Sequence, residues 1–479
     1  MKLKIGFFIF LLLSGFALKA QQGKIWDLQS CINYALENNI QVKQSDLNRI
    51  QSAVALKGAK MSRLPSLNAS TNYNLSTGRS INPFSNVIEN DDIQSQRYNL
   101  NSSMTLFNYS AINNTIKRGV VDLEVSEYNL ENTKNQTTLS IITFFTNVLL
   151  NEEQMKNARF NLETTQIRLD QVEKQAAAGA VNRQELLQAR QQLALDEFNL
   201  INSENAFELA KLSLQQAMQL PVTGDFAIQV PELSDPEVNV LLEKPSTIYQ
   251  TALAEQPDIK SAEANVKSAR LGVKISEAGL YPSITVSAGL ATSYSSIAPP
   301  SIPRDGTDNI TIAVPVGVVP STGETVLASQ DVPAEFDDLT YVRQLDFNQN
   351  SFVGLNLNIP IFNGLSARNN LQNARINQQR AELNAENAKN QLRQNIEQAY
   401  LDAVAAGKSY QSSKKQVEAL TESLKNADQR NALGAITPIE YNQIRNDYNR
   451  AKTDEIRNKY DYIFKLKILD FYQGKNLSF

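Results

Sequence analysis

Apolar and polar residues alternate with a period of two in four segments of the chain, and this is the period of a β-strand. The segments cover residues 66–76, 98–106, 284–290 and 353–361. In the first of them, leucine, alanine, threonine and tyrosine occupy the odd-numbered positions, while serine and asparagine occupy the even-numbered ones. Each segment therefore predicts a strand with one apolar and one polar face.

Two kinds of sheet have such strands. An antiparallel sheet of a soluble protein commonly has one face in water. A strand that crosses a membrane needs about 9 to 11 residues, with its apolar side toward lipid and its polar side toward a lumen, and the segments are near that length. After the N-terminal segment, no apolar run is long enough for a spanning helix. The pattern favours membrane strands and hence an α+β membrane protein.

The predicted strands are too few to close a barrel within one chain. A barrel in lipid needs about eight strands or more, because an open sheet edge would leave backbone groups unpaired. Copies of the chain must therefore share the barrel, and two copies would supply eight strands while three would supply twelve. A polar lumen wide enough for solutes favours the homotrimer with a 12-stranded transmembrane barrel, four strands from each chain.

Long proline-free segments predict helices of unusual length. Residues from about 110 to 178 and from about 366 to 431 are rich in Ala, Leu, Gln, Asn, Glu and Lys. At 1.5 Å per residue, such a helix is roughly 100 Å long. The helix that follows each of them has apolar residues every seven positions, as in a coiled coil, although Glu455 breaks the second series. The apolar positions are Leu186, Leu193, Leu200, Phe207 and Leu214, then Tyr441, Tyr448, Tyr462 and Leu469. An ordinary coiled coil explains these helices equally well, so only the strands favour a channel.

The chain repeats itself, which predicts an internal two-fold repeat. ALENNIQVKQSD from Ala35 aligns with ALAEQPDIKSAE from Ala252, 217 positions later, and LPSL aligns with YPSI in the same register. Further on, the offset is 255 positions. We assign residues 21–220 to a first repeat, 221–245 to a linker that could form an equatorial belt, and 246–479 to a second repeat. The change of offset falls in a proline-rich stretch, which we interpret as an enlarged surface loop over about residues 295–347.

Each half contains one sharp reversal between two helices. The sequences are GAVNRQELLQAR from Gly179 and GAITPIEYNQIR from Gly434. In the second, Gly434 suits the left-handed position that ends a helix, and Thr437 with Glu440 forms a capping box at the start of the next. Asn182 and Glu185 occupy the corresponding places in the first. Each repeat is therefore predicted to have a tight hairpin at the far end of its long helix.

Composition argues against several classes of enzyme site and against nucleic-acid binding. The chain has no histidine, which rules out histidine-based catalytic triads and HExxH zinc sites. Its net charge is −4, and acidic and basic residues are mixed along it, so no basic stripe for nucleic acid stands out. Residues 1–20 have the form of a secretory signal peptide, so the mature chain is expected to leave the cytoplasm. A lipoprotein would need a cysteine directly after the cleavage site, but the single cysteine is Cys31, in the first predicted helix. We therefore expect no enzyme activity, no cofactor, no metal and no lipid anchor.

The repeated order of helix, strands, long helix, reversal and helix, with the LPSL and YPSI strand entries and the G-A-x-x-x-x-E reversals, resembles the TolC family of outer-membrane efflux and secretion channels. The resemblance covers essentially the whole mature chain. It implies a homotrimer whose 12-stranded barrel lies in the outer membrane and continues into a helical barrel in the periplasm. It further implies outer-membrane lipid around the barrel, a periplasmic adaptor (membrane fusion protein) at the hairpins, and an inner-membrane pump of RND, ABC or MFS type.

The resemblance also suggests functional residues at the reversals. Family members often carry two acids after the second turn that narrow the closed entrance. Glu440 matches the first, whereas Gln443 occupies the place of the second, which puts a double acid ring in doubt; Glu185 and Gln188 are the equivalents in the first half. Helix capping explains both glutamates equally well. The small residues of the turns are candidates for adaptor contact, although turn geometry alone accounts for the glycines; they are Gly179, Ala180, Gly434 and Ala435.

Two functions are consistent with the sequence. The leading hypothesis is the passive export duct of a tripartite efflux or type I secretion system. The alternative is a non-transporting trimeric outer-membrane coiled-coil protein, which would serve adhesion or bridge the envelope. A duct conducts ions, whereas a coiled-coil stalk needs no polar lumen. The paired halves favour the duct, because they build a ring of helices rather than a thin rod.

Overall fold

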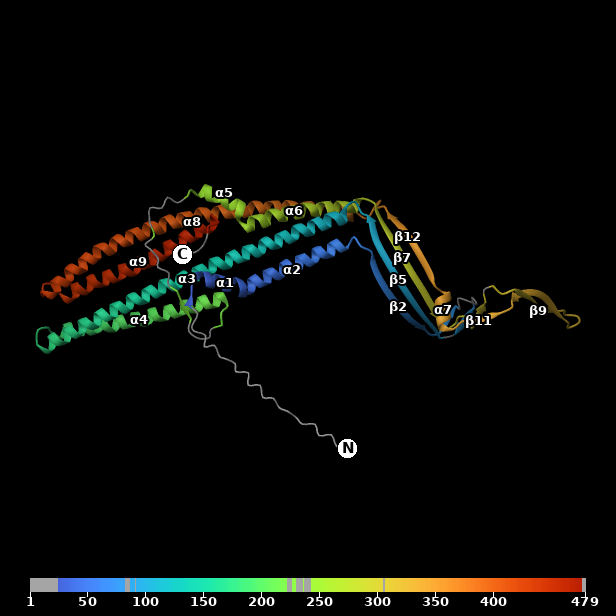
Figure 1. The fold of residues 1–479 in the computed structure, drawn as a ribbon, viewed down its shortest axis with the longest axis horizontal. Helices are drawn as coiled ribbons and strands as arrows, with labels where there is room; N and C mark the ends of the chain where they lie inside the picture. Colours follow the sequence, from blue (N-terminus) through green and yellow to red (C-terminus); the bar gives the residue numbers. More distant parts are fainter. Residues whose placement is uncertain are drawn as a thin grey trace, which may run out of the picture. The chain divides into compact units, whose positions relative to one another are not determined.

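The structure is a computed structural model that describes residues 25–81, 87–90, 92–221, 226–229, 236, 243–304 and 306–475 (Figure 1). The predicted signal peptide lies outside the described residues, and so does most of the predicted linker. The chain divides into two compact units. The helical unit comprises residues 1–52, 122–266 and 380–479, and the strand unit comprises residues 53–121 and 267–379.

The strand unit contains a four-stranded antiparallel sheet in the order β12-β7-β5-β2 (Figure 1). The strands are β2 (Ser66–Ser76), β5 (Ile93–Phe107), β7 (Ser283–Ser295) and β12 (Asn350–Asn358). All four predicted strands are therefore confirmed, and β2 has the predicted bounds. The last strand ends earlier than the alternation suggested, ahead of Pro360, which has no N–H to donate to a ladder.

The predicted division into an apolar and a polar face is confirmed by the register. Ala69 is opposite Leu100, which is opposite Leu290, and directly opposed residues share a face. Asn68 and Asn101 are paired on the other face. An irregularity after Thr105 shifts the end of β5, so that Phe107 rather than Leu106 is opposite Ile284.

The apolar face is exposed in the single chain. Leu67 is 70% exposed, Val353 81% and Leu355 69%. An exposed apolar surface of this extent marks contact with another protein or with a membrane.

The segment predicted as an enlarged surface loop has secondary structure of its own. It contains β8 (Ser301–Pro303), β9 (Asn309–Val318), β10 (Thr325–Pro333), β11 (Phe336–Asp338) and the short helix α7 (Tyr341–Phe347). β9 and β10 form an antiparallel hairpin, and β8 pairs with β11. The corresponding segment of the first half is much shorter, with β3 (Arg79–Ile81) paired with β4 (Ile88–Asn90).

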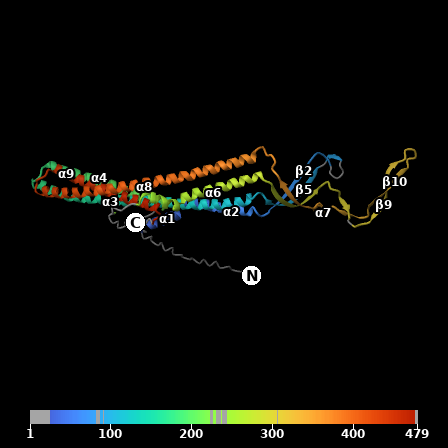
Figure 2. The ribbon, with the colours of Figure 1, turned by 90° about the horizontal axis from the view of Figure 1, so that it is seen from above.

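Two antiparallel helical hairpins make up most of the helical unit, and the first residues of their long helices belong to the strand unit (Figure 1). They are α3 (Ala111–Ala177) with α4 (Arg183–Met218), and α8 (Ser366–Ala432) with α9 (Pro438–Tyr472). The long helices thus have nearly the predicted bounds. Figures 1 and 2 both place the two reversals at the same end of this unit. The heptad positions face the packing seam, and Leu214, Tyr441 and Leu469 are buried.

The helix predicted before the strands of each half is two helices in the structure. They are α1 (Leu28–Asn38) and α2 (Ile40–Met61), then α5 (Pro245–Glu255) and α6 (Pro257–Glu277), which is followed by a 3-10 turn (Ala278–Leu280). Asn39 and Gln256 interrupt them with extended backbone. Pro257 disfavours helical backbone at Gln256, and the Asn39 side chain accepts the Gln41 N–H at 2.8 Å and so starts a new helix.

The two helices before the breaks close hydrophobic cores. Cys31 and Ala35 of α1 pack with Phe145 of α3 and Leu214 of α4. Ile248 of α5 packs with residues of α8 and α9. The strand β1 (Ile25–Trp26), which pairs with β6 (Ala227–Ile228), brings Trp26 into the first core. Among the described residues, no helix combines the length and the apolar character that crossing a bilayer requires.

Candidate functional site at the hairpin reversals

The first reversal ends α3 and starts α4 with backbone hydrogen bonds and one side-chain cap. Gly179 has φ of +72°, and the Ala180 N–H reaches back to the Gln175 carbonyl at 2.8 Å. The Asn182 side chain accepts the Glu185 N–H at 2.9 Å. This is the predicted αL ending followed at once by an N-cap.

The second reversal has the same design. Gly434 has φ of +67°, and the Ala435 N–H donates to the Arg430 carbonyl at 2.7 Å. Thr437 Oγ1 accepts the Glu440 N–H at 3.2 Å. A Cβ atom at Gly179 or at Gly434 would meet no atom within 4 Å, so backbone conformation, and not lack of space within the chain, calls for glycine. Both glycines and the alanines after them are exposed, as contact with a partner would require.

The Glu440 carboxylate takes part in an ion pair across the second turn. Arg430 Nη1 lies 3.1 Å from Glu440 Oε1, and Arg430 Nη2 donates to the Ala435 carbonyl at 3.3 Å. The first half has Gln175 at the place of Arg430, so this pair has no counterpart of the same charge there. Both side chains are about half exposed, at 49% and 47%, and a surface pair of this kind contributes about 0 to 1 kcal/mol.

The other candidate residues lie in different surroundings. Gln443 donates to both carboxylate oxygens of Asp447 at 3.1 Å, which places an acid one turn beyond the glutamine. Glu185 and Gln188 instead line a small crevice with Arg168 of α3 and Asn442 of α9. The structure thus brings the first-half candidates against the second hairpin.

A buried charge cluster joins the two hairpins close to these residues. Arg445 of α9 is 4% exposed, and its guanidinium lies 3.4 Å from the Asp196 carboxylate of α4. It also donates to the Asn161 carbonyl of α3 at 3.0 Å and to the Thr165 hydroxyl. Thr165 in turn donates to Asp196. Burial lowers the pKa of Arg445, and the charge of Asp196 opposes this effect.

A second contact between the hairpins is aromatic. The Arg168 guanidinium lies 3.9 Å from the centre of the Tyr441 ring, an arrangement favourable for a cation–π interaction. The Tyr441 hydroxyl donates to Asp428 at 2.8 Å. Burial and this hydrogen bond to a carboxylate raise the pKa of Tyr441. Tyr441 is therefore a neutral donor at physiological pH.

The cluster was not predicted from the sequence, although the heptad spacing held a signal for it. Asp196 follows Leu193 by three positions and Arg445 follows Tyr441 by four, so each charge lies on the apolar seam of its helix. Charged residues on a packed seam need partners. The spacing could have shown that Asp196 and Arg445 each lie on a packed surface and need a partner, but not that they contact each other.

The polar groups of the cluster join the two hairpins by short contacts. Within the described ranges, no group of three or more histidine, cysteine, aspartate or glutamate residues could hold a metal ion. The chemistry that the cluster offers is ion pairing and hydrogen bonding between two helical hairpins.

Comparisons with known proteins agree with this architecture. Residues 31–218, 248–318 and 339–474 match the family described as outer membrane efflux protein. OpmQ of Pseudomonas aeruginosa, a pyoverdine export outer membrane protein, is 26% identical over 276 residues, which are 56% of this chain and 56% of OpmQ. A probable outer membrane lipoprotein of Salmonella typhimurium, SilC, is 23% identical over 56% of each chain. The chain thus aligns with about half the length of these relatives.

Solved structures share the fold at low sequence identity. The Campylobacter jejuni CmeC outer membrane channel has a TM-score of 0.71 at 17% identity, over 94% of this chain and 87% of CmeC. The open-state MtrE outer membrane channel of Neisseria gonorrhoeae has a TM-score of 0.68 at 18% identity, over 94% and 89%. The resemblance to TolC-type channels is confirmed. The match to the family over most of its length shows that the chain belongs to the outer membrane efflux protein family, whose members are outer-membrane channels.

Proposed function

We propose that the protein is the outer-membrane duct of a tripartite efflux or type I secretion system and that it works as a homotrimer. The trimer would place a 12-stranded barrel in the outer membrane and the helical hairpins in the periplasm. Transport through it would be passive, with energy supplied by an inner-membrane pump of RND, ABC or MFS type. We propose export because OpmQ is named for export.

The open four-stranded sheet carries this proposal. Its order ends in β2 on one side and β12 on the other, and its apolar face is exposed. A sheet with free edges cannot stand in lipid, since each unpaired backbone group would cost several kcal/mol. Pairing β2 of one chain with β12 of the next removes every edge when the ring closes. Three chains are the smallest number that gives more than the minimal eight strands and a lumen beyond side-chain width.

The exposed reversals are the proposed contact for a periplasmic adaptor. Gly179, Ala180, Gly434 and Ala435 present only small side chains, which would let another helical hairpin approach the backbone. The internal repeat doubles the number of such turns, so a trimer would offer six. This number supports a ring-shaped partner around the entrance.

Glu440 and Glu185 are the proposed gate residues, with Gln443 and Gln188 beside them. Copies of Glu440 gathered around a three-fold axis would attract cations and repel each other. Opening would require the two hairpins of each chain to shift against one another. The contacts of Arg445 and Arg168 would have to rearrange in that step.

The proposal is tested by conductance of the purified protein in planar bilayers. We expect ion conductance with a preference for cations, and a weaker preference in Glu440→Gln because one charge per chain is lost. Glu422→Gln is the matched control, because Glu422 is a 70% exposed glutamate on α8 with only a distant 3.9 Å ion pair. It should leave cation selectivity unchanged.

The possible outcomes separate the two functions. A trimer that conducts but is indifferent to Glu440→Gln would remove the gate role and keep the duct. A membrane-inserted trimer without conductance would favour the non-transporting coiled-coil protein. A water-soluble monomer that needs no detergent would refute both.

A further inference from the structure

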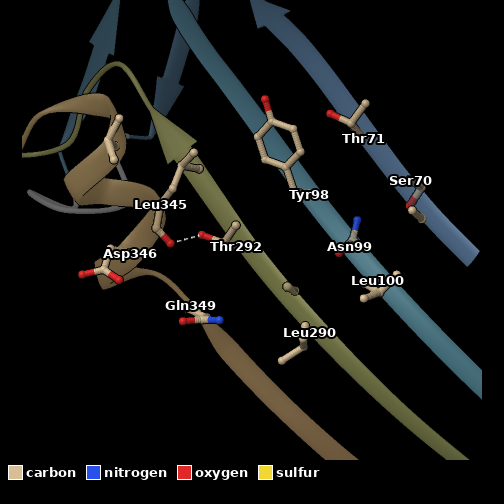
Figure 3. Close-up of a pocket in the computed structure, with 13 residues that line it drawn as sticks. Ser70, Thr71, Tyr98, Asn99, Leu100, Leu290, Thr292, Leu345, Asp346 and Gln349 are labelled. Atoms are coloured by element: carbon tan, nitrogen blue, oxygen red, sulfur yellow. Dashed lines mark hydrogen bonds between the residues drawn. The ribbon is translucent and has the colours of Figure 1, made fainter.

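The short helix α7 lies on the apolar face of the sheet, where the proposed function places lipid. It packs against β7 on the side of Leu290 and Thr292 (Figure 3). The Thr292 hydroxyl donates to the Leu345 carbonyl at 2.5 Å, and the Ser295 N–H donates to the buried Gln344 side chain at 3.0 Å. The helix is thus attached to the sheet by backbone and side-chain hydrogen bonds together.

Tyrosines form the rim of this contact. The Tyr341 hydroxyl lies 2.9 Å from that of Tyr98 on β5 and donates to Gln96 at 2.5 Å. The Tyr294 ring lies 4.8 Å from the Tyr341 ring. Tyrosines with an apolar ring and a wet hydroxyl are enriched where a barrel passes from lipid to water.

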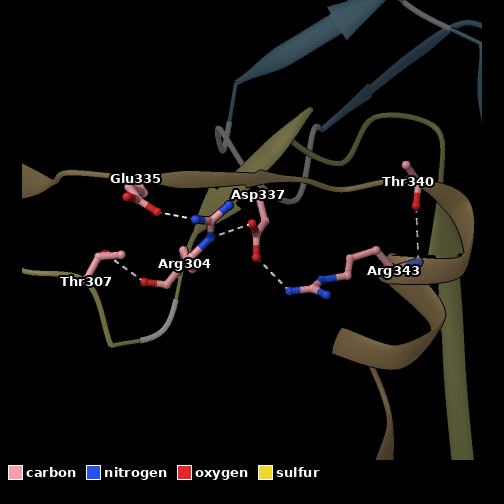
Figure 4. A network of polar contacts seen from close by, with 6 residues as sticks. All are labelled: Arg304, Thr307, Glu335, Asp337, Thr340 and Arg343. Carbon is pink, nitrogen blue, oxygen red and sulfur yellow. Dashed lines mark hydrogen bonds and ion pairs between the residues drawn. The ribbon is translucent and has the colours of Figure 1, made fainter.

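An ion-pair network joins α7 to β11 and to Arg304 (Figure 4). Asp337 of β11 accepts from Arg343 of α7 at 2.7 Å and from Arg304 at 2.8 Å. Arg304 also pairs with Glu335. The start of α7 is capped by Thr340, whose hydroxyl accepts the Arg343 N–H at 3.4 Å. The Arg343 side chain is bound to Asp337, and the Leu345 carbonyl is bound to Thr292. These two contacts fix the orientation of α7 on the sheet.

A crevice of about 680 Å³ lies between α7 and the sheet. This volume falls in the range of small-molecule sites, roughly 300 to 1,000 Å³. Its wall includes the short side chains Ala69 and Thr71 on β2, Leu100 on β5, and Val342 and Leu345 on α7. Figure 3 labels Thr71, Leu100 and Leu345. Polar side chains line the crevice as well: Ser70, Tyr98, Asn99, Thr292, Asp346 and Gln349 (Figure 3). The apolar side chains between them offer contact to a hydrocarbon chain.

Two of the exposed side chains of α7 are apolar, and one of them, Val342, also lines the crevice. Val342 is 73% exposed and Phe347 is 62% exposed. A seven-residue helix is too short to bind a membrane on its own, but the sheet already holds it in place. α7 contacts β7 at Thr292 and Ser295, near the C-terminal end of that strand, whereas α6 precedes its N-terminal end in the chain. Since the proposed function places the helices in the periplasm, α7 would lie at the outer leaflet.

We propose that α7 and the crevice beneath it bind an acyl chain of an outer-leaflet lipid and so anchor the barrel at the external membrane interface. This inference rests on the proposed function, which turns the apolar face of the sheet toward lipid. The helix would lie in the interface, with Arg343 toward the head groups and Val342 and Phe347 toward hydrocarbon. The tyrosine rim would mark the same level.

Tryptophan fluorescence in lipid vesicles tests the position of α7. Val342→Trp, Leu355→Trp and Ile439→Trp are each placed in vesicles of phosphatidylcholine with brominated acyl chains, which quench nearby tryptophan. Trp26 is present in every variant, so the difference from the unmodified protein reports the added tryptophan. We expect Val342→Trp to lose fluorescence as strongly as Leu355→Trp on the sheet, and Ile439→Trp at the hairpin reversal to lose none.

The control variants distinguish failure of this inference from failure of the proposed function. If Leu355→Trp is quenched and Val342→Trp is not, α7 does not reach lipid and the inference is overturned while the barrel stands. If neither is quenched, the membrane barrel itself is wrong.

Filling the crevice tests the bound chain directly. Thr71→Phe places a ring in the crevice, whereas Val353→Phe adds a ring to the same apolar face outside it. Native mass spectrometry of detergent-purified protein after incubation with phosphatidylcholine should show lipid retained by the unmodified protein and by Val353→Phe, and lost from Thr71→Phe. Equal retention by both variants, or none by the unmodified protein, would refute the crevice as a binding site.

Discussion

Arg445 and Arg190 occupy matching places in the two halves of the sequence and have opposite surroundings in the structure. Arg445 is buried against Asp196 and Thr165. Arg190 is 58% exposed and pairs with Glu173 at 3.0 Å. The partner of Arg445 explains the difference, because Asp196 corresponds to Ala451 in the second half. Among the described residues, the two matching arginines thus differ in their ion pairs, one buried and one on the surface.

Removing one partner of the buried pair should destabilise the helical unit. Arg445→Met leaves Asp196 buried without its cation, and we expect a loss of about 3 to 5 kcal/mol in the free energy of unfolding. Urea unfolding followed by helical circular dichroism measures it. The double variant Arg445→Met with Asp196→Leu should recover most of the loss, since no unpaired charge is left.

Arg190→Met is the matched control, because its ion pair is on the surface. It should change the unfolding free energy by less than about 1 kcal/mol. A loss equal to that of Arg445→Met would mean that the burial of Arg445 has no energetic consequence. A double variant no better than the single one would show that the cluster is more than a charge pair.

At the scale of elements, the reversals combine two requirements in one glycine. The turn requires a positive φ at Gly434. The proposed adaptor contact requires that the residue be exposed and carry no side chain, and the space around Gly434 is open. Asparagine separates the two requirements, because it tolerates the left-handed conformation but carries a side chain.

Gly434→Asn should therefore preserve the fold and weaken binding to the adaptor. We expect an unchanged thermal unfolding midpoint, with efflux in cells and cross-linking to the adaptor both strongly reduced. Gly474→Asn is the control, since Gly474 has φ of +68° at the end of α9 and also has open space around it. Full efflux activity of Gly434→Asn would leave turn geometry as the only role of the glycine.

The element bounds show which local signals were sufficient. The long helices and β2 were predicted almost to the residue, because a long proline-free run of helix-forming residues and a period of two are both strong signals. The breaks at Asn39 and Gln256 were missed, although Pro257 marked one of them. The strands and helix α7 of residues 295–347 were missed as well, because the prolines there suggested a loop without structure.

At the scale of the whole molecule, the sheet edges predict the assembly. β2 and β12 are the two edge strands of the sheet. A closed ring therefore requires β2 of each chain to pair with β12 of a neighbouring chain. Cysteines on the polar face of both edges should form disulfides between chains. This arrangement distinguishes a ring from a side-by-side dimer.

The expected product is a ladder that stops at three chains. Asn356→Cys is combined in turn with Ser66→Cys, Asn68→Cys and Ser70→Cys, in a Cys31→Ser background, and one register should give covalent dimers and trimers on denaturing gels. Each single variant should give no ladder, since equivalent residues lie apart around a three-fold axis. A ladder that ends at two chains would contradict the trimer.

The sequence by itself determined the periodic parts of this protein: the faces of the strands, the length of the helices, the reversals and the family. These properties depend on the spacing of residues along the chain, which is visible without a structure. Only the tertiary structure decided that Arg445 is buried and Arg190 is not, and that α7 returns to the apolar face of the sheet. Both depend on residues far apart in sequence, Asp196 for the arginine and Thr292 for α7, and no local pattern specifies which distant residue a side chain will meet.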